Sequence, residues 1–360
     1  MTATESAVLE IDLKAIVANW RKLRALACGD AAAVVKADAY GLGAARVAPA
    51  LYSAGCRHFF VAHFDEALAI RALLPGAMLA VLNGLPAGAE ADFATHEIDP
   101  VLGSLDEVAR WAACARRLGC TLPALLHIDT GMNRLGLDAH ELATLQENRV
   151  LLEGIALRYI LTHLVSSEIA GDSLNTAQLQ RFSAACAGLP PAPRSLANSS
   201  GIFLGDAWRS DLARPGAALY GINPTPDAPN PMQTPVRLRA RVLQVREIQA
   251  GESVGYNATW RASAPRRIAT AGIGYADGWK RSLSGGGYAL FDGSPAPLVG
   301  RVSMDLTTYD VTDSPAAAGG AWLELIGPGI SVDTVAEWAA TNGYEILTSL
   351  GARIARVYTE

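Results

Sequence analysis

The stretch "VVKADAYGLG", residues 34–43, places a lysine at the end of an apolar run and directly before a Tyr–Gly turn. The apolar residues before the lysine predict a buried strand. A lone lysine at such a place is usually an apolar stem with its charge in solvent. Lys36 therefore gains a chemical meaning only if other polar side chains meet it at the same edge of a sheet.

Around this stretch, short apolar runs alternate with longer amphipathic ones. Apolar runs occur at residues 31–37, 58–62, 78–84, 99–103, 121–131 and 152–163, and helical patterns at 44–55, 64–76, 104–119, 139–148 and 175–189. Repeated strand–helix alternation predicts a parallel sheet. The number of units is sufficient for closure into a (β/α)8 barrel of about eight strands. The fold class is therefore α/β.

The character of the chain changes near residue 223. The segment "NPTPDAPNPMQTP", residues 223–235, is typical of a linker. After it, "VRLRARVLQVREI" alternates apolar and polar residues, and "SVDTVAEWAATNG" at 331–343 predicts one late helix that ends at glycine. We therefore predict a barrel over residues 9–228 and a mostly β C-terminal domain over 229–360, with which an N-terminal strand at residues 1–8 can pack.

Composition narrows the class of protein. Of the 360 residues, 50% are hydrophobic and 18% charged, and the net charge of −5 comes without a Lys/Arg block. Neither nucleic acid nor a membrane surface is predicted as a partner. Five cysteines without a CxxC pair favour reduced thiols in a cytoplasmic protein. The acidic N-terminus is unlike a signal peptide, and no apolar run reaches the roughly 18 residues of a membrane span.

Polar residues recur where the predicted strands end. In a barrel of this kind the active site lies at the carboxyl ends of the strands, so these residues are expected to converge. Each alone has an ordinary structural explanation, and only their convergence indicates a site. They are Lys36, His127, Asp129, Arg134, His163, Asn198, Ser199 and Arg214.

Two of these segments also favour an anion. "NSSG" at 198–201 and "RPGAALYG" at 214–221 are small-residue turns whose backbone N–H groups can hold phosphate. No metal-ligand cluster, Walker loop or GxSxG motif is present, so no metal is predicted. A strand-end lysine beside a phosphate site indicates a Schiff base with a phosphorylated aldehyde, and pyridoxal 5′-phosphate (PLP) is the leading candidate.

The sequence resembles the alanine racemases. The resemblance begins with "AVVKADAYGLG" and extends from about residue 5 to residue 358, in motifs that follow the family's order. They are "DTGMNRLG", "THL", "LANSSG", "RPGAALYG", "GESVGYNATW", "GYADGW", "GRVSMD" and "YEILTSLGARIARVY". The family's fold is a PLP-binding (β/α)8 barrel followed by a β domain, which agrees with the independent prediction above.

The resemblance implies a two-base racemisation of L- and D-alanine, which would supply D-alanine for peptidoglycan. Racemisation removes the Cα proton on one face and returns it on the other, so two bases must oppose each other. The family pattern makes Lys36 the base for the D-isomer. It makes Tyr256, provided by the partner subunit of a homodimer, the base for the L-isomer. Without the resemblance, Tyr256 would read as a packed strand tyrosine.

The resemblance also assigns residues to the cofactor and the substrate. The predicted cofactor-binding residues are Lys36, Tyr40, His163, Asn198, Ser199, Arg214, Gly216, Ala217 and Tyr344. The predicted substrate-binding residues are Arg134, Met304, Asp305 and Tyr275. Arg214 would meet the pyridine nitrogen, where a guanidinium donates a hydrogen bond but hardly a proton. The ring nitrogen then stays unprotonated, which weakens the cofactor as an electron sink and limits side reactions of the carbanion.

One departure from the family pattern concerns the surroundings of Arg134. Many members carry a carbamylated lysine two residues before the aspartate of the DTG motif, where this chain has His127. A histidine forms no stable carbamate. We hypothesise that neutral His127, Asp129 or a bound anion such as chloride orients Arg134 instead.

Three alternatives share parts of this pattern. The first is a racemase of broader substrate range. A PLP-dependent decarboxylase of the same architecture would need a carboxylate at the ring nitrogen and a late catalytic cysteine, whereas this chain has Arg214 and no cysteine after Cys186. A non-catalytic PLP-binding protein would be a single barrel, which residues 235–360 argue against. A metal-dependent barrel hydrolase is a remote fourth possibility.

Overall fold

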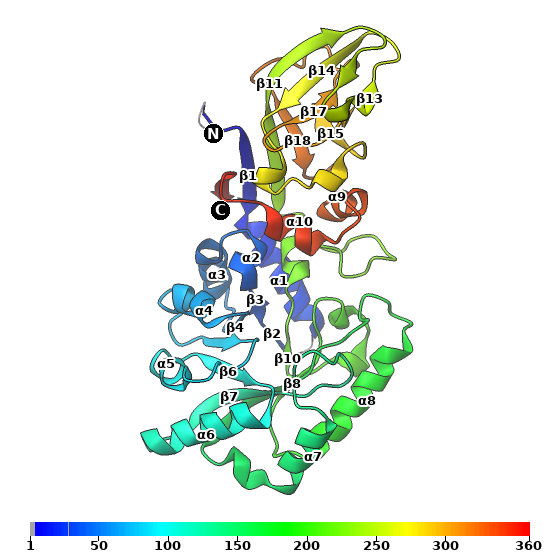
Figure 1. Cartoon of the computed structure of the whole chain (residues 1–360). Helices are drawn as coiled ribbons and strands as arrows, with labels where there is room; N and C mark the ends of the chain where they lie inside the picture. Colours follow the sequence, from blue (N-terminus) through cyan, green and yellow to red (C-terminus); the bar gives the residue numbers. More distant parts are fainter. Residues whose placement is uncertain (1–3, 28) are drawn as a thin grey trace.

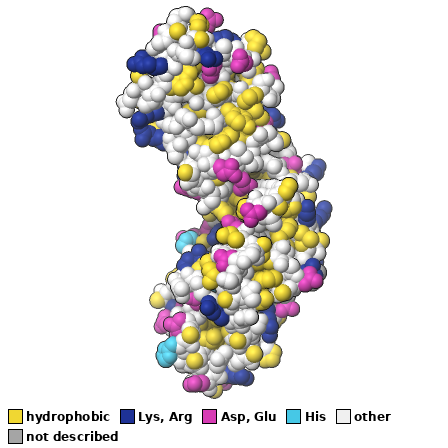
Figure 2. Space-filling model, turned by 90° about the vertical axis from the view of Figure 1, so that its right-hand side faces the viewer, with side chains coloured by type: hydrophobic (Ala, Val, Ile, Leu, Met, Phe, Trp, Pro, Cys, Tyr) yellow, Lys and Arg dark blue, Asp and Glu magenta, His cyan; other side chains and the backbone are white. Residues whose placement is uncertain are grey.

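The chain forms two lobes, a barrel and a β domain, joined by a narrower waist (Figures 1 and 2). The computed structural model describes residues 4–27 and 29–360. In the described residues, no helix has both the length and the apolar character needed to cross a membrane.

The barrel is a ring of parallel strands in chain order. Seven strands pair in sequence: β3 (Ala33–Val34), β4 (His58–Val61), β5 (Met78–Val81), β6 (Asp99–Leu102), β7 (Leu122–His127), β8 (Ile155–Leu161) and β9 (Arg194–Ser195). The ring is closed by β10 (Leu212–Ala213), which pairs with β2 (Asp30–Ala31), directly before β3. The Ala32 N–H donates to the Ala213 carbonyl at 2.9 Å. The predicted fold class, a barrel followed by a β domain, is confirmed.

Helices cover the outside of the barrel because the strands are apolar on both faces. In β4, for example, Phe59, Phe60 and Val61 are all fully buried, as expected for parallel strands with helices outside. The longer helices are α1 (Leu13–Ala27), α3 (Ala44–Ser53), α4 (Phe64–Arg71), α6 (Leu105–Leu118), α7 (Ala139–Glu147) and α8 (Ser173–Ala187). The short ones are α5 (Glu90–Thr95), η1 (Arg149–Leu152), η2 (Gly201–Phe203), η3 (Asp206–Trp208) and η4 (Ala217–Tyr220).

The second lobe is built on one long strand. β11 (Val236–Ile248) pairs with β14 (Arg266–Ala271) and β18 (Trp322–Ile326). The other strands are β12 (Ser253–Val254), β13 (Trp260–Arg261), β15 (Tyr288–Phe291), β16 (Ser294–Pro297), β17 (Thr307–Asp310) and β19 (Ala355–Thr359). Its short helices are η5 (Tyr256–Ala258), η6 (Tyr275–Asp277) and η7 (Arg281–Leu283).

The N-terminal strand differs from its predicted position. β1 (Ala7–Asp12) begins within the predicted range of residues 1–8 but extends beyond it, and residues 1–3 lie outside the described part of the chain. It pairs with β11 and with β19, so residues 9–12 belong to the β sheet and not to the barrel. The alternation of buried Leu9 and Ile11 with Glu10 extends the strand to the start of α1. The division of the chain at residues 228 and 229 stays a prediction.

The predicted late helix over 331–343 forms at the junction of the lobes and is shorter than expected. It is α9 (Val332–Trp338), capped by Ser331, whose hydroxyl accepts a hydrogen bond from the Thr334 N–H. A further helix that the sequence analysis did not predict, α10 (Gly343–Ser349), follows it and is capped by Asn342. Figure 1 shows α10 next to α2 (Lys36–Tyr40), above the barrel. The β domain therefore contributes a helix to the edge of the barrel at which Lys36 lies.

A cluster of charged and polar side chains links β2, β4 and β8 of the barrel. Asp30 on β2 lies 3.2 Å from the His58 ring on β4 and 3.2 Å from the Arg24 guanidinium on α1. His58 in turn lies 3.2 Å from the Tyr159 hydroxyl on β8. The neighbouring His58 ring, assisted by Arg24, lowers the pKa of Asp30.

We expect Asp30→Asn to destabilise the protein in a pH-dependent way. Because the folded-state pKa of Asp30 lies below its unfolded value of about 3.9, the charged form stabilises the fold at higher pH. That contribution is lost as pH falls through the folded pKa. Urea denaturation should show a loss of about 0.5–1 kcal/mol at pH 7 that shrinks below about pH 4. A loss of the same size in Asp227→Asn, whose exposed carboxylate has no ion-pair partner among the described residues, would contradict this explanation.

Candidate active site

Lys36 lies at the start of an unusual turn. In α2, Ala37, Asp38, Ala39 and Tyr40 all have φ between +52° and +56°, so the turn is left-handed. Such a turn costs about 1–2 kcal/mol per residue without glycine and needs support from outside. The Ala37 N–H donates to Glu66 at 2.5 Å, and Asp38 accepts from the Ala44 N–H at 2.7 Å. The turn directs Lys36 and Tyr40 into one cavity.

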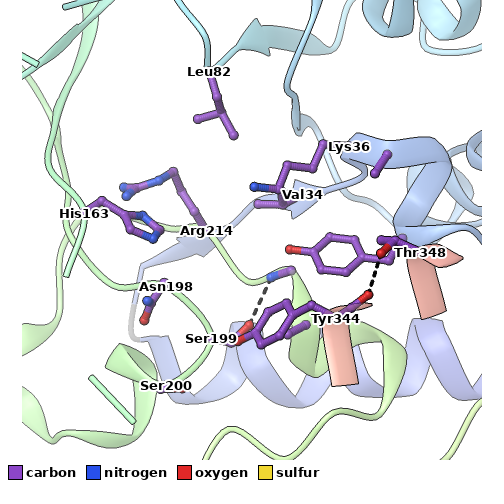
Figure 3. A pocket seen from close by; sticks show the side chains of 14 residues that line it. Val34, Lys36, Leu82, His163, Asn198, Ser199, Ser200, Arg214, Tyr344 and Thr348 are labelled. Carbon is purple, nitrogen blue, oxygen red and sulfur yellow. Dashed lines mark hydrogen bonds between the residues drawn. The ribbon is translucent and has the colours of Figure 1, made fainter. Parts of the chain in front are cut away.

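This cavity, of about 260 Å³, gathers every residue predicted to bind the cofactor. It is lined by Lys36, Tyr40, His163, Asn198, Ser199, Arg214, Gly216, Ala217 and Tyr344, together with Val34, Ala37, Leu82, Ser200 and Thr348. Figure 3 shows Lys36, His163 and Arg214 toward one end, and Ser199 and Tyr344 toward the other. The nitrogen-bearing side chains thus lie toward one end of the cavity and the hydroxyl-bearing ones toward the other.

A cradle for an anion is formed where β10 passes into η4. The Ser199 hydroxyl accepts hydrogen bonds from the N–H groups of Gly216 at 3.0 Å and Ala218 at 3.2 Å (Figure 3 shows the first). A Cβ on Gly216 would lie 2.4 Å from the Tyr40 hydroxyl oxygen, so only glycine leaves room here. Converging N–H groups, a serine and a tyrosine hydroxyl are the donors that a phosphate requires.

Arg214 is the most deeply buried charge of the site, with 4% of its surface exposed. Its guanidinium donates to the carbonyl of Ser195 at 2.8 Å, to the Ser195 hydroxyl at 2.6 Å and to the carbonyl of Thr162. These acceptors lie at the ends of β8 and β9. Burial lowers the pKa of Arg214 to about 10, so the guanidinium remains charged at neutral pH.

The cations of the site shift the titration of their neighbours. Burial and the charge of Arg214 lower the pKa of His163 to about 3 and that of His127 to about 4, so both rings are neutral at pH 7. Burial, followed by the charge of Arg134, lowers the pKa of Lys36. This favours the neutral amine, which is the form that acts as a nucleophile or a base.

The surroundings of Arg134 narrow the hypothesis made from the sequence. The Asp129 carboxylate accepts hydrogen bonds from the N–H groups of Gly131, Met132 and Asn133, so it holds its own loop. Arg134 is exposed and makes no hydrogen bond or ion pair with any residue that the structure describes. Of the three candidates, neutral His127 and a bound anion remain available to orient it.

The other predicted substrate residues lie in the β domain. Within the described chain, Tyr256, Tyr275, Met304 and Asp305 are all outside the cavity that contains Lys36. Tyr275 and Met304 are neighbours, because backbone bonds join residues 275–276 to residues 303–304. Asp305 accepts a hydrogen bond from Arg353 at 2.8 Å. Tyr256 is 70% exposed, so its phenol faces outward.

The sequence analysis missed several residues that support the site. The Tyr344 hydroxyl donates to Glu168 at 2.9 Å, and the buried Thr162 and Ser195 hold Arg214. Thr162 and Ser195 stand at strand ends and could have been included on position alone. Glu168 follows His163 in a loop, where nothing in the local pattern distinguishes it from a solvated carboxylate.

Fold and site together define a class: a barrel protein with a reactive lysine and a phosphate cradle at its mouth, joined to a β domain. Comparison with protein families makes this specific. Residues 11–224 match the model "Alanine racemase, N-terminal domain", and residues 235–358 match "Alanine racemase, C-terminal domain". The chain belongs to the alanine racemase family, which confirms the resemblance found in the sequence.

Individual relatives agree over nearly the whole length. An alanine racemase from Acidiphilium cryptum is 56% identical over 97% of this chain and 98% of its own length. One from Methylobacterium nodulans is 52% identical over 100% of this chain and 98% of its own. The crystal structure of the Bartonella henselae enzyme, with covalently bound pyridoxal phosphate, has 45% identity and a TM-score of 0.95, covering 98% of this chain and 99% of that one.

The role of Gly216 in the phosphate cradle can be tested against a second glycine, Gly171, as a control. Gly216→Ala places a methyl group against the Tyr40 hydroxyl, whereas a Cβ at Gly171 would have no atom within 4 Å. Overpacking of this kind costs about 1–3 kcal/mol. Titration of pyridoxal phosphate into cofactor-free protein should therefore show at least a roughly tenfold weaker affinity for Gly216→Ala and no change for Gly171→Ala. Equal affinities of the two variants would be inconsistent with a cradle at Gly216.

Proposed function

We propose that this protein is a PLP-dependent alanine racemase that interconverts L- and D-alanine. The observation that carries the proposal is the position of the Lys36 amine in the same cavity as the cradle at Ser199 and Gly216. Family membership over nearly the whole chain, and relatives with this activity at 50–56% identity, support it.

The residues of the cavity fit PLP. The cofactor's phosphate would be held by Ser199, the N–H groups of Gly216 and Ala217, and the hydroxyls of Tyr40 and Tyr344. The Tyr344 hydroxyl, which donates to Glu168 here, would have to turn its proton to the phosphate. Arg214 would donate to the ring nitrogen, and neutral His163 and Asn198, which line the same cavity, would face the ring. When bound, PLP supplies the electron sink that stabilises a carbanion at the substrate Cα. A buried arginine at the ring nitrogen disfavours the decarboxylase alternative.

Proton transfer at Cα falls to two side chains of this protein. Lys36, with its pKa lowered by burial and by Arg134, is suited to accept the proton on one face. For the opposite face we propose Tyr256 from a second copy of the chain in a homodimer. Its outward phenol sits on a turn in which Asn257 and Ala258 also have positive φ. Positive φ values at residues other than glycine cost energy and often occur at functional sites.

The substrate carboxylate would be met by Arg134 and, from the partner subunit, by the Met304 backbone, with Tyr275 and Asp305 near the entrance. Hydrophobic side chains gather on one face of the β domain (Figure 2), as expected for a surface that a second copy covers. The relatives at 50–56% identity are alanine racemases, which favours alanine over a broader substrate range.

We place the reaction in the cytoplasm, where it would supply D-alanine for peptidoglycan. Four of the five cysteines lie in the described part of the chain, and these four are unpaired: Cys56, Cys114, Cys120 and Cys186. Unpaired thiols favour a reducing compartment.

The shared site predicts complementation between two inactive variants. Lys36→Ala and Tyr256→Phe should each abolish racemisation of L-alanine as homodimers. In a mixed dimer one site would carry both substitutions and the other neither. Refolding an equal mixture should thus restore about a quarter of the wild-type activity, since half of the dimers are mixed and each has one intact site. Deuterium uptake at Cα of L-alanine measures it.

Two results would contradict these roles. If Tyr256→Phe alone retains full activity with L-alanine, the tyrosine is not the second base. If the mixture stays inactive while sequential affinity capture of two differently tagged chains shows mixed dimers, each site takes both bases from one chain.

The orientation of Arg134 gives a further prediction. His127→Lys with added bicarbonate should have a lower KM for L-alanine than the same variant without bicarbonate, because a carbamate would place negative charge near Arg134. The wild type and His127→Gln, which form no carbamate, should not respond. A bicarbonate response of equal size in the wild type would mean that the effect does not arise at position 127.

A further inference from the structure

One buried amide outside the cavity is bonded to the segments that hold the site. Gln178 lies on α8, on the outer side of the barrel, and is 0% exposed. Its Oε1 accepts from the Val165 N–H at 2.8 Å. Its Nε2 donates to the Thr130 hydroxyl at 3.0 Å and to the His163 carbonyl at 3.0 Å. Both N–H donors of the amide are used and its oxygen accepts one bond, so the orientation of the side chain is well defined.

These bonds join the loops that leave two neighbouring strands. Thr130 follows β7, whereas His163 and Val165 follow β8. The hydroxyls of Thr130 and Thr162 also share a hydrogen bond of 2.8 Å. Gln178 thus fixes the backbone on both sides of Leu164 and connects it to the end of β7.

The same short segment carries the groups that face the cavity. His163 lines the cavity, and the carbonyl of Thr162 accepts a hydrogen bond from Arg214 (Figure 3 shows His163 and Arg214). A shift of this backbone would move the histidine ring and one of the anchors of the buried guanidinium together. The strength of hydrogen bonds to a buried charge depends on the positions of the acceptors, so a shift of this backbone would weaken the bond to Arg214.

We propose that Gln178 is a positioning residue that sets the orientation of Arg214 and His163 toward the cofactor ring. It touches neither cofactor nor substrate and acts through the Thr162–Val165 backbone. The inference rests on the role proposed above for Arg214 at the ring nitrogen.

The same helix offers a matched control. Asn175, 1% exposed, lies one turn before Gln178 on α8, and its amide donates to the carbonyls of Ser166 at 3.3 Å and Ile169 at 3.0 Å. Its bonds hold the outer part of the same loop, beyond the backbone that contacts Arg214. Gln178→Met and Asn175→Leu each replace a buried amide by an apolar side chain of similar size, so both should lower stability.

The experiment compares these variants as PLP-loaded enzymes. We expect Gln178→Met to shift the visible absorbance band of lysine-bound PLP, to weaken PLP binding several-fold and to lower kcat about tenfold, with KM changed less than threefold. Asn175→Leu should lower the thermal unfolding temperature similarly but leave the absorbance band and kcat unchanged. Gln178→Glu, which retains the acceptor but loses both donors, serves as a second variant and should resemble Gln178→Met.

The outcomes separate this inference from the proposed function. If both helix variants shift the band and kcat alike, or if neither does, Gln178 has only a structural role and the inference is wrong. Arg214→Lys tests the premise independently. If it leaves the band unchanged, the role of Arg214 fails; if it shifts the band while Gln178→Met and Gln178→Glu do not, only the inference fails. A wild type that racemises no alanine would overturn the proposed function itself.

Discussion

The burial of one guanidinium is the constraint on which the site depends. A charge with 4% exposure is tolerated only if protein groups replace the water that it has lost, and Arg214 finds its acceptors on Thr162 and Ser195. Both residues stand at the carboxyl ends of adjacent strands, so the register of β8 and β9 is fixed together with the side chain. The chain then turns into the "RPGAALYG" segment, whose Gly216 N–H belongs to the cradle. One buried charge therefore connects strand pairing to the geometry of the cradle.

Burial, together with the charges of Arg214 and Arg134, also lowers the pKa values of the basic groups around the cavity. His127 and His163 are held neutral by burial and by Arg214, while Lys36 loses basicity through burial and Arg134. A chain with net charge −5 thus concentrates positive potential in one cavity. Such a cavity favours a ligand with a phosphate and a substrate with a carboxylate, because each relieves the repulsion between the cations. A cationic neighbour also makes Lys36 more reactive, because it favours the neutral amine, which is the form that acts as a nucleophile or a base.

The sequence predicted what depends on periodicity and missed what depends on tertiary contacts. Strand–helix alternation gave the barrel, and position at strand ends together with family motifs gave the residues that line the cavity. The sequence predicts an N-terminal strand that can pack with the β domain but not its extension to Asp12, because the pairing with β11 and β19 joins segments more than 200 residues apart. Gly41 indicates a turn after Lys36, but the left-handed residues 37–40 contain no glycine and depend on hydrogen bonds to Glu66 and Asp38. Gln178 and Asn175 are both buried amides on the inner side of α8, so the helical pattern does not distinguish them. They differ only in their hydrogen-bond partners, the carbonyl of His163 for Gln178 and that of Ser166 for Asn175.

The distribution of residues between the lobes separates two tasks. The groups assigned to the cofactor line one cavity within a single chain, to which the β domain contributes only Tyr344 and Thr348 on α10. Tyr256, Tyr275 and Met304 lie instead on the exposed surface of that domain. In the proposed dimer, cofactor binding needs one folded chain, whereas proton transfer on the second face needs two. In that dimer a single chain with its cofactor would lack the opposing base, so racemisation would depend on the assembly of two copies whereas cofactor binding would not.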